Sequence, residues 1–188
     1  MKQEFFDALE NSPVIAAAKD EEGLNRCLTC DSQIIFLLFG DICNVGELVQ
    51  KIKDSGKIAM VHIDLIQGLS PKEIAVDFIR KYTRADGIIS TKPALIKYAK
   101  KQGFYTVLRF FVIDSLALSS IEKQLQLVKP DIIEVLPALM PKVISRICEM
   151  ISVPVIAGGL ISDKEDIMAM LSAGAVSISS TSQNTWFL

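Results

Sequence analysis

Short runs of apolar and β-branched residues recur eight times along the 188-residue chain. Their starts lie about 23 residues apart on average, which accommodates one strand, one helix and two short loops per unit. The eight runs occupy residues 14–18, 34–39, 58–65, 87–90, 105–111, 132–136, 155–157 and 176–179. Because nearly every residue in a run is apolar, the runs are typical of strands in a parallel sheet that is covered on both faces.

The segments between the runs carry the apolar periodicity and the end signals of helices. Start signals precede four of them, at Ser70-Pro71, Lys92-Pro93 and Met140-Pro141 and at the capping box of Ser162 with Glu165. Eight strand-helix units close naturally into a barrel. We therefore predict a single (β/α)8 TIM barrel with short loops, and an open doubly wound sheet is the alternative.

No linker or low-complexity segment divides the chain, so we expect one domain over residues 1–188. Residues 3–11, before Pro13, have the pattern of a short helix. We expect residues 1–12 to form an N-terminal cap that plugs the barrel at the amino ends of its strands.

Composition and charge narrow the class of protein. Half of the residues are hydrophobic and 22% are charged, which excludes extensive disorder. The formal net charge of −2 argues against coating nucleic acid by bulk charge, but it leaves room for a local basic patch. No apolar run is long enough to span a bilayer, and the acidic start does not resemble a secretory signal. We expect a cytoplasmic protein without membrane contact.

The four cysteines do not form a metal-binding pattern. Cys27 and Cys30 make a C-x-x-C, but Cys43 and Cys148 are isolated, whereas a zinc site needs a second pair. We expect reduced thiols, no metal and no cofactor, and a metal or redox role for the C-x-x-C is the alternative.

Polar residues interrupt the apolar strands near their carboxyl ends, where barrels of this kind carry their functional sites. They are Lys19, Asp41, His62, Asp64, Lys92, Arg109 and Glu134. The two-residue spacing of His62 and Asp64 points both side chains to one face of a strand. Because unpaired buried charges cost several kcal/mol, ion pairs such as Lys19 with Asp41 or Arg109 with Glu134 would relieve that cost. Solvated strand ends are the structural alternative.

A diglycine, Gly158-Gly159, follows the seventh run, and Ser180, Thr181 and Ser182 follow the eighth. Glycine lets backbone N–H groups approach an anion closely, and the hydroxyls add donors. Loops after the last two strands form the usual phosphate site of this fold. The spacing predicts a phosphate-binding site there, with a pair of tight turns as the alternative.

Basic residues gather between residues 72 and 109, where nine basic residues face three acidic ones, a net charge of +6. A solvated helix face is the ordinary reason for such a run. Contact with the phosphate backbone of RNA is the functional interpretation. Its candidate residues are Arg80, Lys81, Arg84, Lys97, Lys100 and Lys101.

Over nearly its whole length the sequence resembles the glycerol-3-phosphate-responsive antiterminators of bacterial glycerol-uptake operons. The resemblance rests on the segments 11–17 with Lys19, 35–41, 62–69, 87–92, 109–115, 134–138 and 154–161. It implies a regulator, not an enzyme, that binds glycerol 3-phosphate as effector. It also implies a second partner, the leader mRNA of a glycerol-metabolism operon, whose binding prevents transcription termination.

Under this interpretation the residues after the last two strands hold the phosphate, and the strand-end charges orient the glycerol. A small phosphosugar isomerase or aldolase is the alternative, with His62 or Asp64 as general base and Lys19 or Lys92 as electrophile or Schiff-base amine. Short loops leave little to close over such chemistry. A phosphate-binding barrel without an RNA partner, and a homo-oligomer, also remain open.

Overall fold

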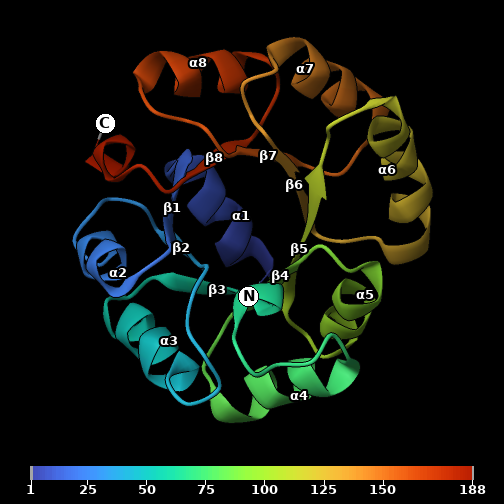
Figure 1. Cartoon of the computed structure of the whole chain (residues 1–188). Helices are drawn as coiled ribbons and strands as arrows, with labels where there is room; N and C mark the ends of the chain where they lie inside the picture. Colours follow the sequence, from blue (N-terminus) through green and yellow to red (C-terminus); the bar gives the residue numbers. More distant parts are fainter. Residues whose placement is uncertain (1, 188) are drawn as a thin grey trace.

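A computed structural model describes residues 2–187. Eight parallel strands form a closed barrel in sequence order, as predicted (Figure 1). They are β1 (Val14–Ala18), β2 (Ile34–Leu37), β3 (Ile58–His62), β4 (Gly87–Ser90), β5 (Tyr105–Phe111), β6 (Ile132–Leu136), β7 (Val155–Gly158) and β8 (Ser177–Ser180). The ring closes where Ile15 of β1 pairs with Ser179 of β8. The open doubly wound sheet is therefore excluded.

Helices surround the barrel and run between consecutive strands (Figure 1). They are α2 (Glu21–Cys27), α3 (Val45–Asp54), α4 (Glu73–Tyr82), α5 (Pro93–Lys101), α6 (Ser115–Val128), α7 (Pro141–Met150) and α8 (Lys164–Ser172). Two 3-10 helices, η1 (Ile63–Leu65) and η2 (Gln183–Phe187), follow β3 and β8. No helix among residues 2–187 is long and apolar enough to cross a membrane.

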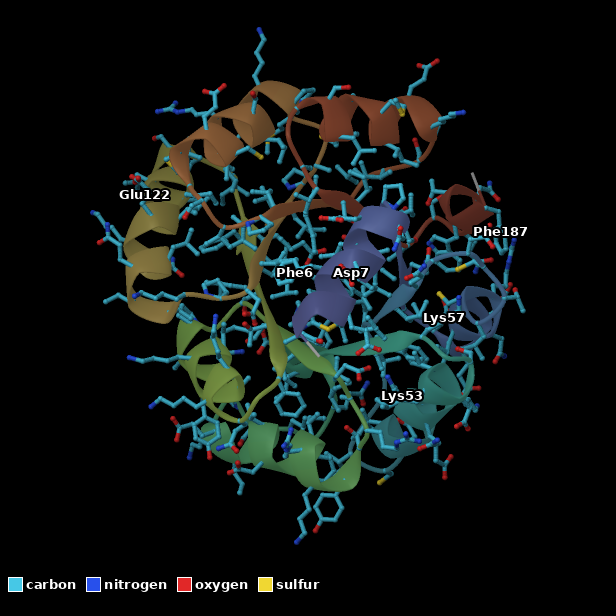
Figure 2. The ribbon with its side chains drawn as sticks, turned by 180° about the vertical axis from the view of Figure 1, so that it is seen from behind. Phe6, Asp7, Lys53, Lys57, Glu122 and Phe187 are labelled. Carbon is cyan, nitrogen blue, oxygen red and sulfur yellow. The ribbon has the colours of Figure 1, made fainter. Side chains whose placement is uncertain are left out.

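Helix α1 (Lys2–Asn11) lies across the barrel axis instead of joining the outer ring (Figure 1). Figure 2 shows its Phe6 and Asp7 at the centre of the ring, whereas Glu122 of α6 lies at the periphery. Fully buried Phe5 stacks on Tyr105, the first residue of β5, with ring centroids 4.6 Å apart. The helix thus fills the barrel at the amino ends of the strands.

Along the strands, side chains alternately face the barrel interior and the surrounding helices. Ile15, Ile34, Met60, Val107 and Ile156 pack with α1 inside the ring, while their sequence neighbours face the helices. A side chain two residues beyond an inner residue therefore also points inward. This alternation decides which strand-end residues meet inside the barrel.

Several predicted boundaries are wrong. The third strand ends at His62, not residue 65, because the chain turns into η1 and Asp64 bonds to the end of β4. Helix α4 begins at Glu73, so Pro71 precedes it and is not its first residue. Helix α8 is capped by Asp163 rather than Ser162, and the Asp163 side chain accepts from the Asp166 backbone N–H at 2.9 Å.

Candidate functional site

A pocket of about 380 Å³ opens at the carboxyl ends of the strands. Its size falls within the range of small-molecule sites. Its lining comes from β1, β5, β6 and β8 and from the segments that follow β1, β2, β7 and β8. The lining residues are Ala17, Lys19, Leu38, Arg109, Glu134, Leu136, Gly159, Leu160, Ile161, Ser179, Ser180, Thr181 and Ser182. The structure thus brings together seven of the predicted residues, among them the phosphate-site candidates Gly159, Ser180, Thr181 and Ser182.

The inner rows of the barrel place the charged members. Lys19 lies two residues beyond Ala17, Arg109 two beyond Val107, and Glu134 two beyond Ile132. The lower members of these rows are apolar and pack against α1, so the polar residues begin one layer above the apolar plug. Lys19 is exposed at the rim, whereas Arg109 and Glu134 are buried.

A buried ion pair forms the floor of the pocket. Arg109 Nε donates to Glu134 Oε2 at 2.6 Å, which confirms the predicted pairing. The Ser179 hydroxyl donates to the other carboxylate oxygen of Glu134. Among residues 2–187 the terminal guanidinium nitrogens of Arg109 have no hydrogen-bond partner. Arg109 therefore keeps donors for an anion in the pocket, while Glu134 is fully occupied.

Gly158 supports this floor rather than the pocket wall. A Cβ atom at this position would lie 2.4 Å from Ser179 Oγ and 2.7 Å from Glu134 Oε1. Glycine is therefore required for Glu134 and Ser179 to approach β7. Gly159, not Gly158, is among the residues that line the pocket, and the phosphate contact expected of Gly158 stays a prediction.

The loops after β7 and β8 lie side by side, as the diglycine and the serine tract predict. Gly159 and Leu160 have positive φ of 79° and 64°, which turns the chain sharply over the pocket. Ser180 Oγ donates to the Ile161 carbonyl at 3.1 Å and accepts from Ser182 N–H at 3.1 Å. Its hydroxyl thus joins the two loops. The hydroxyls of Thr181 and Ser182 have no partner among the described residues.

His62, Asp64 and Lys92 form a second polar cluster outside the lining of the pocket. His62 is 3% exposed and its Nδ1 has no partner among the described residues. Burial, helped by the nearby Arg109 charge, lowers the pKa of His62 to about 4, so the imidazole is neutral at pH 7.

Asp64 joins the ends of β3 and β4. Its carboxylate accepts from Ser90 Oγ at 2.9 Å, Thr91 N–H at 2.8 Å and Lys92 Nζ at 3.0 Å. Burial acts against the charged form of Asp64, but the hydrogen bonds from Thr91, Lys92 and Ser90 outweigh it and lower its pKa. Asp64 and Lys92 therefore form an ion pair with each other.

Asp41 does not reach the pocket. Its carboxylate accepts from the backbone N–H of Cys43 at 2.7 Å and of Asn44 at 3.1 Å in the turn that leads into α3. The predicted ion pair with Lys19 does not form, since Lys19 has no ion pair with any described residue. The sequence position of Asp41, just beyond a strand, does not distinguish a ligand contact from such a turn.

The basic residues of the span 72–109 do not form one surface. Arg109 and Lys92 lie at the carboxyl ends of the strands, with the pocket and the second polar cluster. Arg80 and Lys100 line a hollow at the opposite end of the barrel. Lys100 Nζ is committed to Asp131 at 3.0 Å and to the Lys129 carbonyl at 2.6 Å. Lys81, Arg84, Lys97 and Lys101 are exposed.

The C-x-x-C cysteines are buried at the end of α2, with Cys27 as its last residue. Cys30 Sγ donates to the Cys27 carbonyl at 3.2 Å, and burial raises the pKa of Cys27 to about 12. The thiol of Cys27 is therefore unreactive at neutral pH. Among residues 2–187 no group of three or more His, Cys, Asp or Glu side chains is arranged to hold a metal.

Comparison with known proteins assigns the family. A family model described as glycerol-3-phosphate responsive antiterminator matches residues 14–186, which include every strand. The chain belongs to the glycerol-3-phosphate-responsive antiterminator family. Among curated proteins, the uncharacterized protein YgcP of Escherichia coli (strain K12) is 43% identical over 180 residues, covering 96% of this chain and 94% of that protein.

Solved structures of antiterminator proteins share the architecture closely. The glycerol uptake operon antiterminator regulatory protein of Listeria monocytogenes str. 4b F2365 is 31% identical, with a TM-score of 0.90 over 94% of this chain and 95% of that chain. A glycerol uptake operon antiterminator-related protein of Thermotoga maritima MSB8 is 36% identical, with a TM-score of 0.82 over 93% and 98%.

Enzymes share the barrel at a greater distance. Deoxyribose phosphate aldolase of Aeropyrum pernix has a TM-score of 0.69 over 96% of this chain and 89% of that chain, but only 15% identity. At that identity the likeness shows the fold alone.

Sequence reasoning missed three contributors to these sites. Ser179 holds Glu134, Ile161 anchors Ser180, and Ser90 binds Asp64. The inward position of Ser179 could have been found from its spacing of two to Thr181, just after the last strand. The roles of Ile161 and Ser90 depend on contacts between neighbouring loops, which no local pattern encodes.

Proposed function

We propose that this protein binds glycerol 3-phosphate in the pocket at the carboxyl ends of the strands and acts as a transcription antiterminator. In the ligand-bound state it would bind the leader mRNA of a glycerol-metabolism operon in the cytoplasm and prevent termination. The observation that carries the proposal is that Arg109, whose terminal guanidinium nitrogens have no partner among the described residues, lines one pocket together with the loops after β7 and β8.

In this arrangement the phosphate lies against the loops after β7 and β8. The Gly159 turn brings backbone close to the ligand, and the Thr181 and Ser182 hydroxyls add donors. Arg109 supplies hydrogen-bond donors from the floor of the pocket, and Lys19 supplies positive charge at its rim. Glu134 does not repel the anion, because Arg109 and Ser179 already neutralise and occupy its carboxylate.

Regulation requires that the ligand favours the RNA-binding conformation. A ligand that binds both conformations equally shifts nothing. Coupling energies between sites are typically ~1–3 kcal/mol, which corresponds to about 5- to 150-fold in RNA affinity. We expect glycerol 3-phosphate to tighten RNA binding within that range.

The test is the affinity of the protein for the leader RNA of its own organism's glycerol operon, measured at one salt concentration. Glycerol 3-phosphate is present in one series, and glycerol with inorganic phosphate in the other. Tighter binding in the first series alone supports the proposal. Equal affinities in both series would exclude a ligand-controlled antiterminator.

The geometry favours a regulator over the aldolase-type alternative. Lys92 Nζ is held by Asp64, and neutral His62, with a pKa of about 4, is a weak general base at neutral pH. Lys19 is the lysine that lines the pocket. Borohydride treatment with triose phosphates should therefore leave Lys19 unmodified, whereas a trapped adduct on it would favour the enzyme.

A further inference from the structure

A second hollow, of about 440 Å³, lies at the amino ends of the strands, opposite the effector pocket. Its position follows from its lining, which includes Ile58 and Tyr105, the first residues of β3 and β5, together with Gly103 and Phe104 just before β5. Helix α1 borders it through Glu4. The proposed function does not use this hollow.

The hollow presents polar atoms beside the buried Phe104 and the partly buried Tyr105. Tyr105 Oη is buried and makes no hydrogen bond of normal geometry with a described residue, although the Phe5 backbone acts on it and opposes the rise in its pKa that burial causes. Asp86 also lines it. Its Oδ2 accepts from Lys53 Nζ and Ala59 N–H, whereas its Oδ1 accepts from no described residue. A buried polar group without a partner costs free energy, so a ligand with donors and acceptors along one edge would be favoured here.

Both signs of charge line the hollow, because Glu4, Asp86 and Asp131 lie there with Arg80 and Lys100, and Lys53 and Lys100 pair with Asp86 and Asp131. Positive charge without an ion-pair partner lies beside it. The Arg80 guanidinium lies 5.5 Å from the centre of the Phe104 ring, and it makes no ion pair with a described residue. Lys97 and Lys101 lie one turn apart on α5, next to Lys100 in the lining, and both are exposed. Residues spaced by four share one face of a helix, so the two ammonium groups can follow a phosphate backbone.

We propose that this hollow binds an unpaired nucleotide of the RNA, with the base beside Phe104 and Tyr105 and the flanking phosphates on Arg80, Lys97 and Lys101. Single-stranded RNA is recognised by splayed-out bases that meet aromatic side chains or guanidinium planes and bond along their polar edges. The inference rests on the proposed function and adds where the RNA binds. The effector and the RNA then occupy opposite ends of one barrel, and coupling passes through the strands.

Two matched triple variants test the phosphate contacts. Arg80→Ala with Lys97→Ala and Lys101→Ala removes three exposed positive charges beside the hollow. Lys142→Ala with Arg146→Ala and Lys164→Ala removes three exposed charges from α7 and α8, across the ring from α4 and α5 (Figure 1). Both variants change net charge equally, and calorimetric titration of glycerol 3-phosphate checks that the effector pocket is intact.

The first triple variant should bind leader RNA roughly tenfold or more weakly than wild type at physiological salt, with glycerol 3-phosphate affinity unchanged. Its plot of log affinity against log salt should flatten by about 2, since each phosphate contact to a single strand contributes about 0.7. The control triple should stay close to wild type. Equal losses in both triples, or none in the first, would overturn the nucleotide site.

Tyr105→Phe tests the hollow itself. It removes one unsatisfied hydroxyl, so the folded protein should be as stable as wild type or more so. RNA affinity should fall roughly fivefold, the value of one net hydrogen bond. Unchanged affinity would place the base elsewhere.

Two further outcomes distinguish the proposals. One outcome is that free adenosine or guanosine monophosphate binds as tightly as RNA and that Tyr105→Phe weakens this binding. It would assign the hollow to a free nucleotide and overturn the RNA contact. Failure of the wild-type protein to bind leader RNA with or without effector would overturn the proposed function. Undiminished RNA binding by both the first triple variant and Tyr105→Phe would overturn this site alone.

Discussion

At the scale of single residues, the pocket depends on a buried ion pair whose two members differ in the hydrogen-bonding atoms that they leave available. Glu134 is fully buried and bonded on both oxygens, whereas Arg109 keeps donors toward the pocket. A buried pair contributes little net stability, but losing one partner leaves an uncompensated charge. Stability and ligand binding can therefore be separated by mutation.

Arg109→Met should lower the free energy of unfolding by about 3 kcal/mol, because Glu134 is left buried without its partner. Adding Glu134→Leu should restore most of that loss, since the unpaired carboxylate is gone. Neither variant should bind glycerol 3-phosphate. Urea unfolding and calorimetric titration measure the two effects, and a double variant that binds the ligand as wild type does would remove Arg109 from the site.

His62 gives the fold a predictable pH dependence. Burial and Arg109 lower its pKa from 6.5 to about 4, so between these values the unfolded chain takes up a proton that the folded chain refuses. The contribution of His62 to the free energy of unfolding should therefore be fully present above pH 6.5. It should be lost, on the order of 3 kcal/mol, as the pH drops to about 4. His62→Gln should lose this slope.

Because His62 is the one histidine of the chain, its imidazole NMR signals can be assigned without ambiguity. The folded protein should show no titration of these signals between pH 7 and pH 5. A midpoint near 6.5 in the folded state would contradict the buried, neutral imidazole.

Residues also show what local pattern can and cannot provide. Arg109 and Glu134 could be predicted, because a charge inside an apolar strand has to pair or face a site. Asp64 was placed on one strand face with His62, yet the chain leaves the strand at His62 and Asp64 bonds to residues about 27 positions later. Contacts between neighbouring strand ends depend on the closed ring and not on local spacing.

At the scale of elements, α1 fills the interior of the barrel at the amino ends of the strands. Phe5 is fully buried against Tyr105, while the neighbouring Phe6 is half-buried. The apolar pattern of residues 3–11 was enough to predict this helix. Its stacking partner was not predictable, because Tyr105 lies far away in the sequence.

Phe5→Ala should destabilise the protein by about 3 kcal/mol, because it leaves a cavity between α1 and the barrel. Phe6→Ala is the matched control and should cost about 1 kcal/mol or less. Urea unfolding curves of the two variants measure the difference. Equal costs would mean that α1 does not fill the barrel end through Phe5.

At the scale of the whole molecule, the two ends of the barrel have separate chemistry. The end where the strands terminate gathers Arg109 and the loops after β7 and β8 around one pocket. The end closed by α1 has a second hollow, lined by Arg80 and Lys100 among others. The eightfold sequence recurrence was sufficient to predict the closed barrel. The basic span of the sequence looked continuous, but the winding of the chain distributes it over both ends.

The most direct measurement is calorimetric titration of glycerol 3-phosphate onto wild type, Thr181→Glu and Ser152→Glu. Thr181 lies at the rim of the pocket, and Ser152 is exposed before β7 at the other end, so both variants add one negative charge without disturbing the core. Wild type and Ser152→Glu should bind the ligand equally, while Thr181→Glu should bind it at least about tenfold more weakly through charge repulsion. Undiminished binding by Thr181→Glu, or no binding by wild type, would contradict a phosphate site between the last two strands.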